Sequence, residues 1–397
     1  MKLSFDDSVE SFRQEFLEWF AQNRPTPEEM AADPKQSSAH VPEWCRKWIG
    51  RQFADGWLVP GWPKERGGRN AGPIETLVYM EELRKADVPR STNPQGLGII
   101  TPSILDYGTP EQIEKYAMPV LRGERTACLG MSEPGAGSDL ASLSTRAVLD
   151  GDHFVINGQK VWTSGAAWAD FCFLFCRTDP TAPKHKGISI ILVDMDTPGI
   201  TVRPIEEIVD RKHPDLAEVF LTDVLVPKEN LVGEMNNGWA MANGSLAHER
   251  GMVWLDGVML LEAMVRDALA EAPAALDRKH PTERGALTDA LMQSYIDSVA
   301  ARCLGYRGFA KLVRGGNAPE QALMKAFDSE SRQRLALRMS ELLGAEALEF
   351  DQDASGYMAD ASWLELYFRT FASTISAGSS EIQRNIIAEK VLGLPRG

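Results

Sequence analysis

Small and hydroxyl-bearing residues form a compact run at 133–139, Glu-Pro-Gly-Ala-Gly-Ser-Asp. Gly135 and Gly137 lack side chains, so backbone amides there can approach an anion closely, and Ser138 adds a hydroxyl donor. This pattern is typical of a site for a diphosphate. The run also fits a tight turn between strands, and its glycines alone favour that simpler interpretation.

A second run, 157–165 (Asn-Gly-Gln-Lys-Val-Trp-Thr-Ser-Gly), places a large indole beside two hydroxyls. A flavin needs an apolar wall against one ring face and hydrogen-bond donors at its polar edge and at N5. Trp162, Thr163 and Ser164 offer these groups, although Trp162 taken alone fits a core position better. Because both runs lie at the edges of predicted strands, we interpret them together as one wall of a flavin site.

Three blocks of different periodicity carry these residues. Apolar residues at helical spacing dominate 1–125, strand-like patterns dominate 126–234, and helical periodicity returns over 235–397. We therefore expect an α+β protein with an N-terminal helical domain, a central antiparallel β-sheet domain and a C-terminal helical domain. This order differs from the strand–helix alternation of a doubly wound dinucleotide-binding fold.

Finer signals mark individual elements. Thr109-Pro110-Glu111 is a helix-start signature, and breaks in helical periodicity lie near 272–282, 315–319 and 351–356. Turn residues at Asp150-Gly151-Asp152 mark the central block. The stretches there that have strand character are 126–131, 145–156, 171–177, 187–194, 201–204 and 219–226.

Composition excludes several classes of function. The 42 basic against 56 acidic residues give a net charge of −14, which argues against a nucleic-acid surface. The six histidines form no metal-ligand pair, so we expect no metal site. The longest apolar stretches, 171–176 and 188–193, fall far short of the roughly 20 residues that span a bilayer. With no visible secretory signal and five cysteines that suit reduced thiols, we expect a cytoplasmic protein without membrane association.

The two runs resemble the signature elements of the acyl-CoA dehydrogenase family, and the similarity covers nearly the whole chain. The resemblance implies that family's fold, in which the C-terminal helices form a four-helix bundle, and FAD as the cofactor. Further segments that match the family are 56–68, 108–112, 223–233 and 376–394.

The resemblance also implies roles for individual residues. The FAD contacts expected from it are Leu129, Met131, Ser132, Gly137, Ser138, Trp162, Thr163, Ser164, Ser379 and Glu381. The substrate contacts expected from it are Ser138, Arg250, Ala377 and Gly378, with the Ala377 N–H donating to the thioester oxygen. The stretch 93–97 is expected to line the acyl pocket.

The family reaction is FAD-dependent α,β-dehydrogenation of an acyl-CoA thioester to the trans-2-enoyl-CoA. A carboxylate removes the α-proton, the β-hydride passes to flavin N5, and the electrons pass to an electron-transferring flavoprotein. The family places its base at one of two positions, and Ala377 leaves one of them vacant.

The other position holds Glu249, within Ala247–Gly251, as in the isovaleryl and long-chain branches of the family. A helix glutamate is ordinarily a solvated one. The vacancy at Ala377 and the apolar stretch 252–254 favour Glu249 as the base, since burial would raise its pKa. Glu381 is the second candidate acid, but its position matches a cofactor contact.

Two elements depart from typical homotetrameric members. The Arg-x-x-Phe-Gly segment that grips a neighbouring subunit's flavin is replaced by Leu276–Leu287, and a Gly-Gly turn is reduced to Leu343–Glu346. This pattern resembles actinobacterial members acting on bulky or steroid side-chain acyl-CoAs, some of which are heterotetramers. We expect a homo- or hetero-oligomer arranged as a dimer of dimers.

Two other functions stay open at this point. The chain could be a non-catalytic or half-site partner subunit of a heterotetrameric acyl-CoA dehydrogenase, although the presence of both runs and Glu249 argues against this. It could also be a related flavin oxidase or monooxygenase, which the accessibility of the flavin to oxygen would decide. The sequence does not identify the acyl chain.

Overall fold

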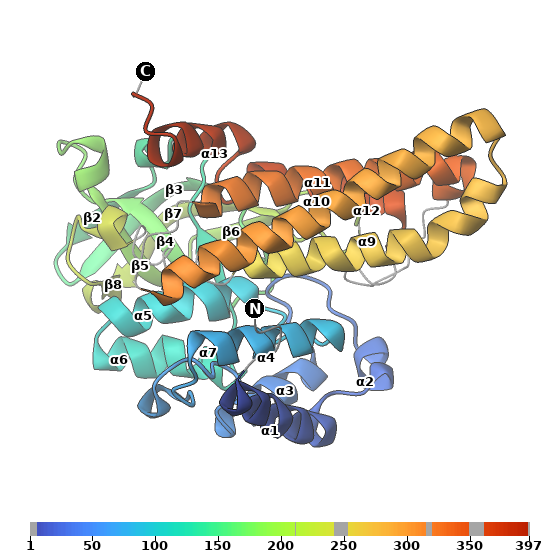
Figure 1. Cartoon of the computed structure of the whole chain (residues 1–397). Coiled ribbons are helices and arrows are strands. Elements are labelled where there is room, and N and C mark those ends of the chain that lie inside the picture. The colour runs from blue at the N-terminus through green and yellow to red at the C-terminus, as the bar shows by residue number, and fades with distance from the viewer. Residues whose placement is uncertain (1–5, 211, 242–252, 315–319, 349–360, 396–397) are drawn as a thin grey trace. The chain divides into compact units, whose positions relative to one another are not determined.

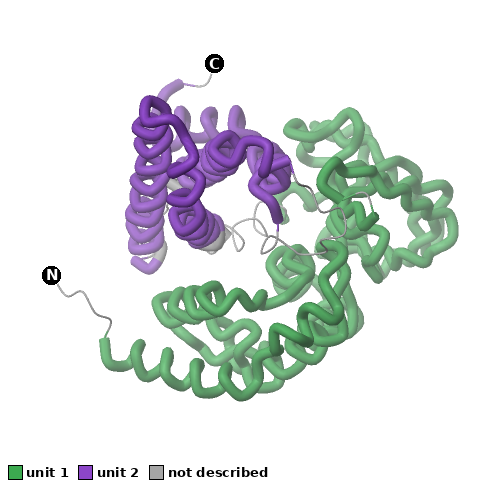
Figure 2. Tube along the Cα trace, turned by 90° about the vertical axis from the view of Figure 1, so that its right-hand side faces the viewer, with its two compact units in different colours: residues 1–249 green, residues 250–397 purple. Residues whose placement is uncertain are grey.

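The structure is a computed structural model that describes residues 6–210, 212–241, 253–314, 320–348 and 361–395. The Cα trace divides into two compact units, 1–249 and 250–397 (Figure 2). The first unit contains a helical layer and a β-sheet, and the second contains helices. This order confirms the predicted helix–sheet–helix arrangement. Among the described residues, no helix combines the length and apolar character needed to cross a membrane.

The N-terminal helices of the first unit form a layer (Figure 1). This layer has its own aromatic core. Phe16, Trp48, Trp57 and Tyr79 are almost fully buried there. The predicted start at Thr109 is confirmed, because Thr109 and Gln112 form a reciprocal capping box. The α-helices of this layer are α1 Asp7–Asn23, α2 Pro27–Ala32, α3 Glu43–Ala54, α4 Pro73–Lys85, α5 Thr101–Tyr107, α6 Pro110–Gln112 and α7 Met118–Leu121. Its 3-10 and π turns are η1 Lys64–Arg66, η2 Gly96–Ile100 and η3 Ile113–Ala117.

The sheet runs in the order β6-β7-β3-β2-β4-β5-β8, with β1 also paired to β4. Most pairs are antiparallel as expected, but β1 and β2 both pair with β4 in parallel, so the sheet is mixed. The stretch 145–156 is not one strand, because the turn at Gly151 divides it into the hairpin β2–β3. The strands are β1 Ala127–Gly130, β2 Arg146–Asp150, β3 His153–Lys160, β4 Phe171–Arg177, β5 Ile188–Asp194, β6 Ile200–Pro204, β7 Ala217–Pro227 and β8 Leu231–Val232. The short turns among them are η4 Leu140–Ser142, η5 Lys184–Lys186 and η6 Lys228–Asn230.

Strand β4 is buried on both faces, which explains its unbroken apolar sequence. Phe171, Phe173 and Phe175 pack with residues of α5, η3 and α7. Cys172 and Cys176 point to the opposite face, into a core shared with β3, β5 and β7. Their i, i+4 spacing on one face was expected, and both thiols are buried and free. The sheet is therefore covered by helices on one side and encloses its own apolar core on the other.

The second unit is built from long helices around α11, which packs against α9, α10 and α12. The predicted break within 272–282 falls between α9 and α10, although α9 continues through Pro273. The breaks expected at 315–319 and 351–356 lie outside the described residues. The elements are α9 Val253–Asp277, α10 Pro281–Val313, α11 Glu320–Leu343, η7 Gly344–Leu348, α12 Trp363–Ile375, α13 Ser380–Ile386 and η8 Ile387–Val391.

Candidate active site

The run 133–139 begins with a tight turn directly after β1. The Glu133 N–H donates to the Ala136 carbonyl, and the Ala136 N–H donates back to the Glu133 carbonyl, each at 3.0 Å. The turn that the glycines suggested is thus present. It does not by itself distinguish a structural segment from a ligand site, so the surroundings of the turn must decide.

A buried carboxylate anchors this turn. Glu133 accepts hydrogen bonds from the Ser144 N–H at 2.6 Å, the Ser144 hydroxyl at 2.8 Å and the Thr145 N–H at 2.8 Å. It also accepts from Lys160 Nζ at 2.8 Å, and the Lys160 side chain is fully buried. Burial opposes ionisation of Glu133, but the Lys160 ammonium and the other donors outweigh it and lower the pKa to about 2.

Lys160 joins the first run to the second. Its Nζ donates to the Met131 carbonyl at 3.0 Å as well as to Glu133, and the next residue, Val161, donates its N–H to the Ser132 carbonyl at 2.9 Å. Leu129, in β1, is half-buried beside them. The structure therefore places the two runs side by side, as their joint interpretation requires.

The second run ends in a turn that presents Trp162. Its backbone is left-handed, with φ of 60°, and its side chain is 59% exposed. The turn is fixed behind it, because the Thr163 N–H donates to the Ala217 carbonyl at 3.0 Å and the Gly165 N–H to the Asp215 carbonyl at 2.7 Å. A mostly exposed indole on a fixed turn can serve as the apolar wall that a flavin ring requires.

The two runs also carry unused hydrogen-bonding capacity and open space. The buried Thr163 hydroxyl has no hydrogen-bond partner in the described part of the chain, and Ser164 is half-exposed. Gly137 and Ser138 are exposed, and a Cβ added at Gly135 or Gly137 would meet nothing within 4 Å. A flavin with its diphosphate fits these features: the hydroxyl of Thr163 without a partner among the described residues, the exposed indole of Trp162, and glycine backbone with open space around it.

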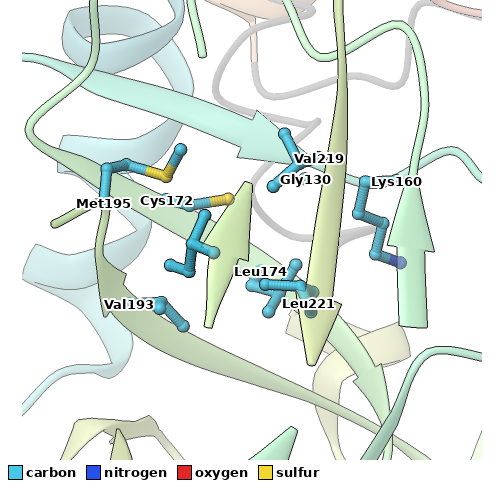
Figure 3. A pocket seen from close by; sticks show the side chains of 9 residues that line it. Gly130, Lys160, Cys172, Leu174, Val193, Met195, Val219 and Leu221 are labelled. Carbon is cyan, nitrogen blue, oxygen red and sulfur yellow. The ribbon is translucent and has the colours of Figure 1, made fainter. Parts of the chain in front are cut away.

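One small cavity lies inside the core of the sheet. Its volume is about 10 Å³. Figure 3 shows the side chains that line it, among them Leu174, Val193, Met195 and the stem of Lys160. A volume of this size holds about one water molecule at most. The cavity is therefore a small packing defect between strands.

The remaining described site residues belong to the second unit. Ala377 is exposed and left-handed with φ of 52°, and Gly378 follows with φ of 89°. Ser379 is the N-cap of α13, its hydroxyl accepting from the Ile382 N–H at 3.4 Å. Glu381 is fully exposed, and hydrogen bonds from its own backbone N–H and from Ser379 lower its pKa. Glu381 is therefore a carboxylate already satisfied at a helix start.

Two predicted residues cannot be placed. Glu249 and Arg250, the expected base and a substrate contact, lie outside the described residues. Within 93–97, Asn93 exchanges two hydrogen bonds of 3.0 Å with Ala127, so its amide holds the edge of β1. The pocket-lining role expected of 93–97 stays a prediction.

The roles of Glu133 and Lys160 were not foreseen from the sequence. The signal for Lys160 was alternation, because Phe154, Ile156 and Lys160 share a parity in β3 and are all buried. A lysine on a core-facing position implies a buried acidic partner. Alternation does not identify that partner, which lies on another segment.

Comparisons with known proteins agree with this geometry. Family models described as the acyl-CoA dehydrogenase N-terminal, middle and C-terminal domains match residues 6–124, 128–224 and 236–392. The chain is 35% identical to acyl-CoA dehydrogenase IpdE1 of Mycobacterium tuberculosis over 98% of each chain. A solved structure titled Tcur3481-Tcur3483 steroid ACAD matches with a TM-score of 0.80 at 32% identity, covering 100% of both chains. The ChsE4-ChsE5 complex from Mycobacterium tuberculosis matches with a TM-score of 0.79 at 30% identity, again over 100% of both.

Proposed function

Because the chain belongs to the acyl-CoA dehydrogenase family, we propose that it oxidises the Cα–Cβ bond of a bulky acyl-CoA thioester to the trans-2-enoyl-CoA. The observation that carries this proposal is the junction of the two runs. Glu133 and Lys160 lock them together, and the exposed Trp162 stands on the fixed turn beside them. A catalytically silent chain would have no evident use for this arrangement.

FAD is the cofactor in this proposal. Its isoalloxazine would pack beside Trp162, its ring edge would meet Ser132, Thr163 and Ser164, and its diphosphate would lie near Gly137 and Ser138. Bound flavin would supply the acceptor for the β-hydride. Backbone groups of Leu129 and Met131 and side chains of Ser379 and Glu381 complete the proposed set of cofactor contacts.

The chain's own residues would handle the proton and the thioester. Glu249 would accept the α-proton as a general base. The Ala377 N–H would donate to the thioester oxygen, where negative charge develops as the α-proton leaves. The methyl group of Ala377 cannot accept a proton, so that position contributes only its backbone. Gly378, Ser138 and Arg250 are the further substrate contacts.

The bulky substrate is proposed from a structural neighbour. A solved structure that matches the whole chain at 32% identity is described as a steroid ACAD. A base at position 249 is compatible with branched, long or ring-bearing acyl groups and does not choose among them. The test is anaerobic bleaching of the flavin against a panel of straight-chain, branched and steroid acyl-CoAs, with product identification. We expect the fastest bleaching with a steroid side-chain thioester and an enoyl-CoA as product. Bleaching by none of the panel would contradict the proposal.

Subunit composition is a second element of the proposal. The segment 276–287 lacks the Arg-x-x-Phe-Gly pattern that completes a neighbour's flavin site, and two of the matched structures are titled with two different subunits. We propose that this chain pairs with a related but different subunit. Flavin measured per chain in the protein purified alone tests this, and a full equivalent in a stable homotetramer would contradict it.

The electrons would then pass to an electron-transferring flavoprotein. Slow reoxidation of the substrate-reduced protein by air would distinguish such a dehydrogenase from an oxidase. Rapid aerobic reoxidation of the substrate-reduced protein would instead favour the related flavin oxidase or monooxygenase.

A further inference from the structure

The turn between α12 and α13 has two consecutive left-handed residues, Ala377 and Gly378. Glycine is required at the second position, because a Cβ there would lie 2.6 Å from Gln383 Nε2. Alanine at the first position carries a side chain and is still left-handed, with φ of 52°. A non-glycine residue keeps a left-handed backbone only where its surroundings hold it there.

Two side chains hold this turn through its carbonyls. Lys325 Nζ, from α11, donates to the Gly378 carbonyl at 2.6 Å, and Gln383 Nε2, from α13, donates to the Ala377 carbonyl at 3.0 Å. A peptide unit is planar and trans, so Gln383 also fixes the N–H of Gly378, and Lys325 also fixes the N–H of Ser379. On the other side of Ala377, the Ser376 N–H donates to the Ala372 carbonyl at 2.8 Å. The peptide units on both sides of the one that carries the Ala377 N–H are therefore held.

The position of Lys325 differs from that of an ordinary surface lysine. Its side chain is half-buried, and burial followed by the neighbouring Arg332 lowers its pKa. The carboxylates of Asp328, Glu330 and Glu381 act in the opposite sense and favour its charge. A half-buried ammonium that donates to the Gly378 carbonyl is well placed to hold the turn in one conformation.

We propose that Lys325 is a positioning residue for acyl-CoA oxidation: by holding the Gly378 carbonyl, it stabilises the two-residue left-handed turn from which Ala377 presents its N–H to the thioester oxygen. The inference rests on the proposed function, in which the Ala377 N–H stabilises charge on that oxygen. Lys325 acts through the turn and touches neither substrate nor cofactor in this account.

The test compares Lys325→Met, which removes the donor but keeps the aliphatic stem, with Lys325→Arg, which retains a donor. Arg384→Met is the matched control, because Arg384 links α13 to the same helix, α11, through Glu330 at 2.5 Å. Each variant is assayed as full-length, flavin-loaded protein on the acyl-CoA that bleaches the wild type fastest. Hydrogen exchange of the amides in 376–380 is measured in parallel, and thermal unfolding checks that each variant folds.

Lys325→Met should lower kcat about 10- to 100-fold, somewhat less than loss of an oxyanion donor itself, with KM within about threefold of wild type. Amide exchange in 376–380 should accelerate at least about tenfold. Lys325→Arg should recover most of both losses, and Arg384→Met should change neither.

Wild-type kcat and exchange in Lys325→Met would overturn the inference. Equal losses in Arg384→Met would also overturn it, because they would indicate general loosening of α13. If none of the acyl-CoAs bleaches the flavin of the wild type, the proposed function fails. The exchange measurement then still decides whether Lys325 holds the turn.

Discussion

Residues 129–165 and residues 376–381 share one proposed task, presenting hydrogen-bond donors to a ligand, but the chain secures them by different means. The first segment is built into a sheet and locked by the buried pair Glu133–Lys160. The second is a strained turn held by two side-chain donors, Lys325 and Gln383. The conformation of 129–165 therefore follows from the folding of the sheet. The conformation of 376–381 depends instead on a few side-chain hydrogen bonds that single substitutions can remove.

Replacing Glu133 should therefore have the largest effect on stability. Glu133→Gln leaves the buried Lys160 ammonium without its counter-charge, and we expect a loss of about 3–5 kcal/mol in the free energy of unfolding. Urea denaturation measures this loss. Asp139→Asn is the matched control, since the Asp139–Lys184 pair is exposed on both sides and contributes little. Equal stability of the two variants would contradict a structural lock at Glu133.

Acid should release the same lock. The folded pKa of Glu133, about 2, lies below its unfolded value of about 4.3. Its contribution is thus fully present above about pH 4.3 and is lost as the pH falls toward 2, with a total of about 3 kcal/mol. The stability difference between wild type and Glu133→Gln should shrink between pH 5 and pH 3 in denaturation experiments. A difference that stays constant over this range would be inconsistent with the lowered pKa.

Two glycines separate fold from function within the first segment. A Cβ at Gly165 would lie 2.4 Å from the Ala39 Cβ, at a φ of 72°, so Gly165→Ala should cost about 2–3 kcal/mol of stability. Gly137→Ala meets open space and should leave the unfolding midpoint unchanged while weakening flavin binding. Chemical denaturation and flavin titration measure the two effects. Unchanged flavin affinity in Gly137→Ala would remove Gly137 from the proposed site.

Local signals predicted much of the fold. The apolar run at 171–177 became β4 with its predicted limits, because a strand buried on both faces needs apolar residues at every position. The capping box at Thr109 was readable because its partners lie three residues apart. The stretch 145–156 was harder, since its apolar residues continue on both sides of the turn at Gly151.

Long-range pairing accounts for what the sequence did not reveal. Glu133 meets Lys160 only through the positions of β1 and β3 in the sheet, and Lys325 meets Gly378 only through the packing of α11 beside α13. No local pattern encodes either pair. The parallel pairing of β1 with β4 was not predicted, because it too joins segments that are far apart in the sequence. The domain limits at 125 and 234 and the role of Glu249 stay predictions.

The most direct test of the account is single-turnover bleaching by Glu249→Gln, beside Glu381→Gln, under anaerobic conditions with the best acyl-CoA. We predict that Glu249→Gln retains wild-type flavin content but bleaches about 100- to 10,000-fold more slowly, because the α-proton has lost its base. Glu381→Gln should bleach at a rate near that of the wild type once loaded with flavin. Wild-type bleaching by Glu249→Gln, with bleaching lost in Glu381→Gln, would contradict the proposed chemistry.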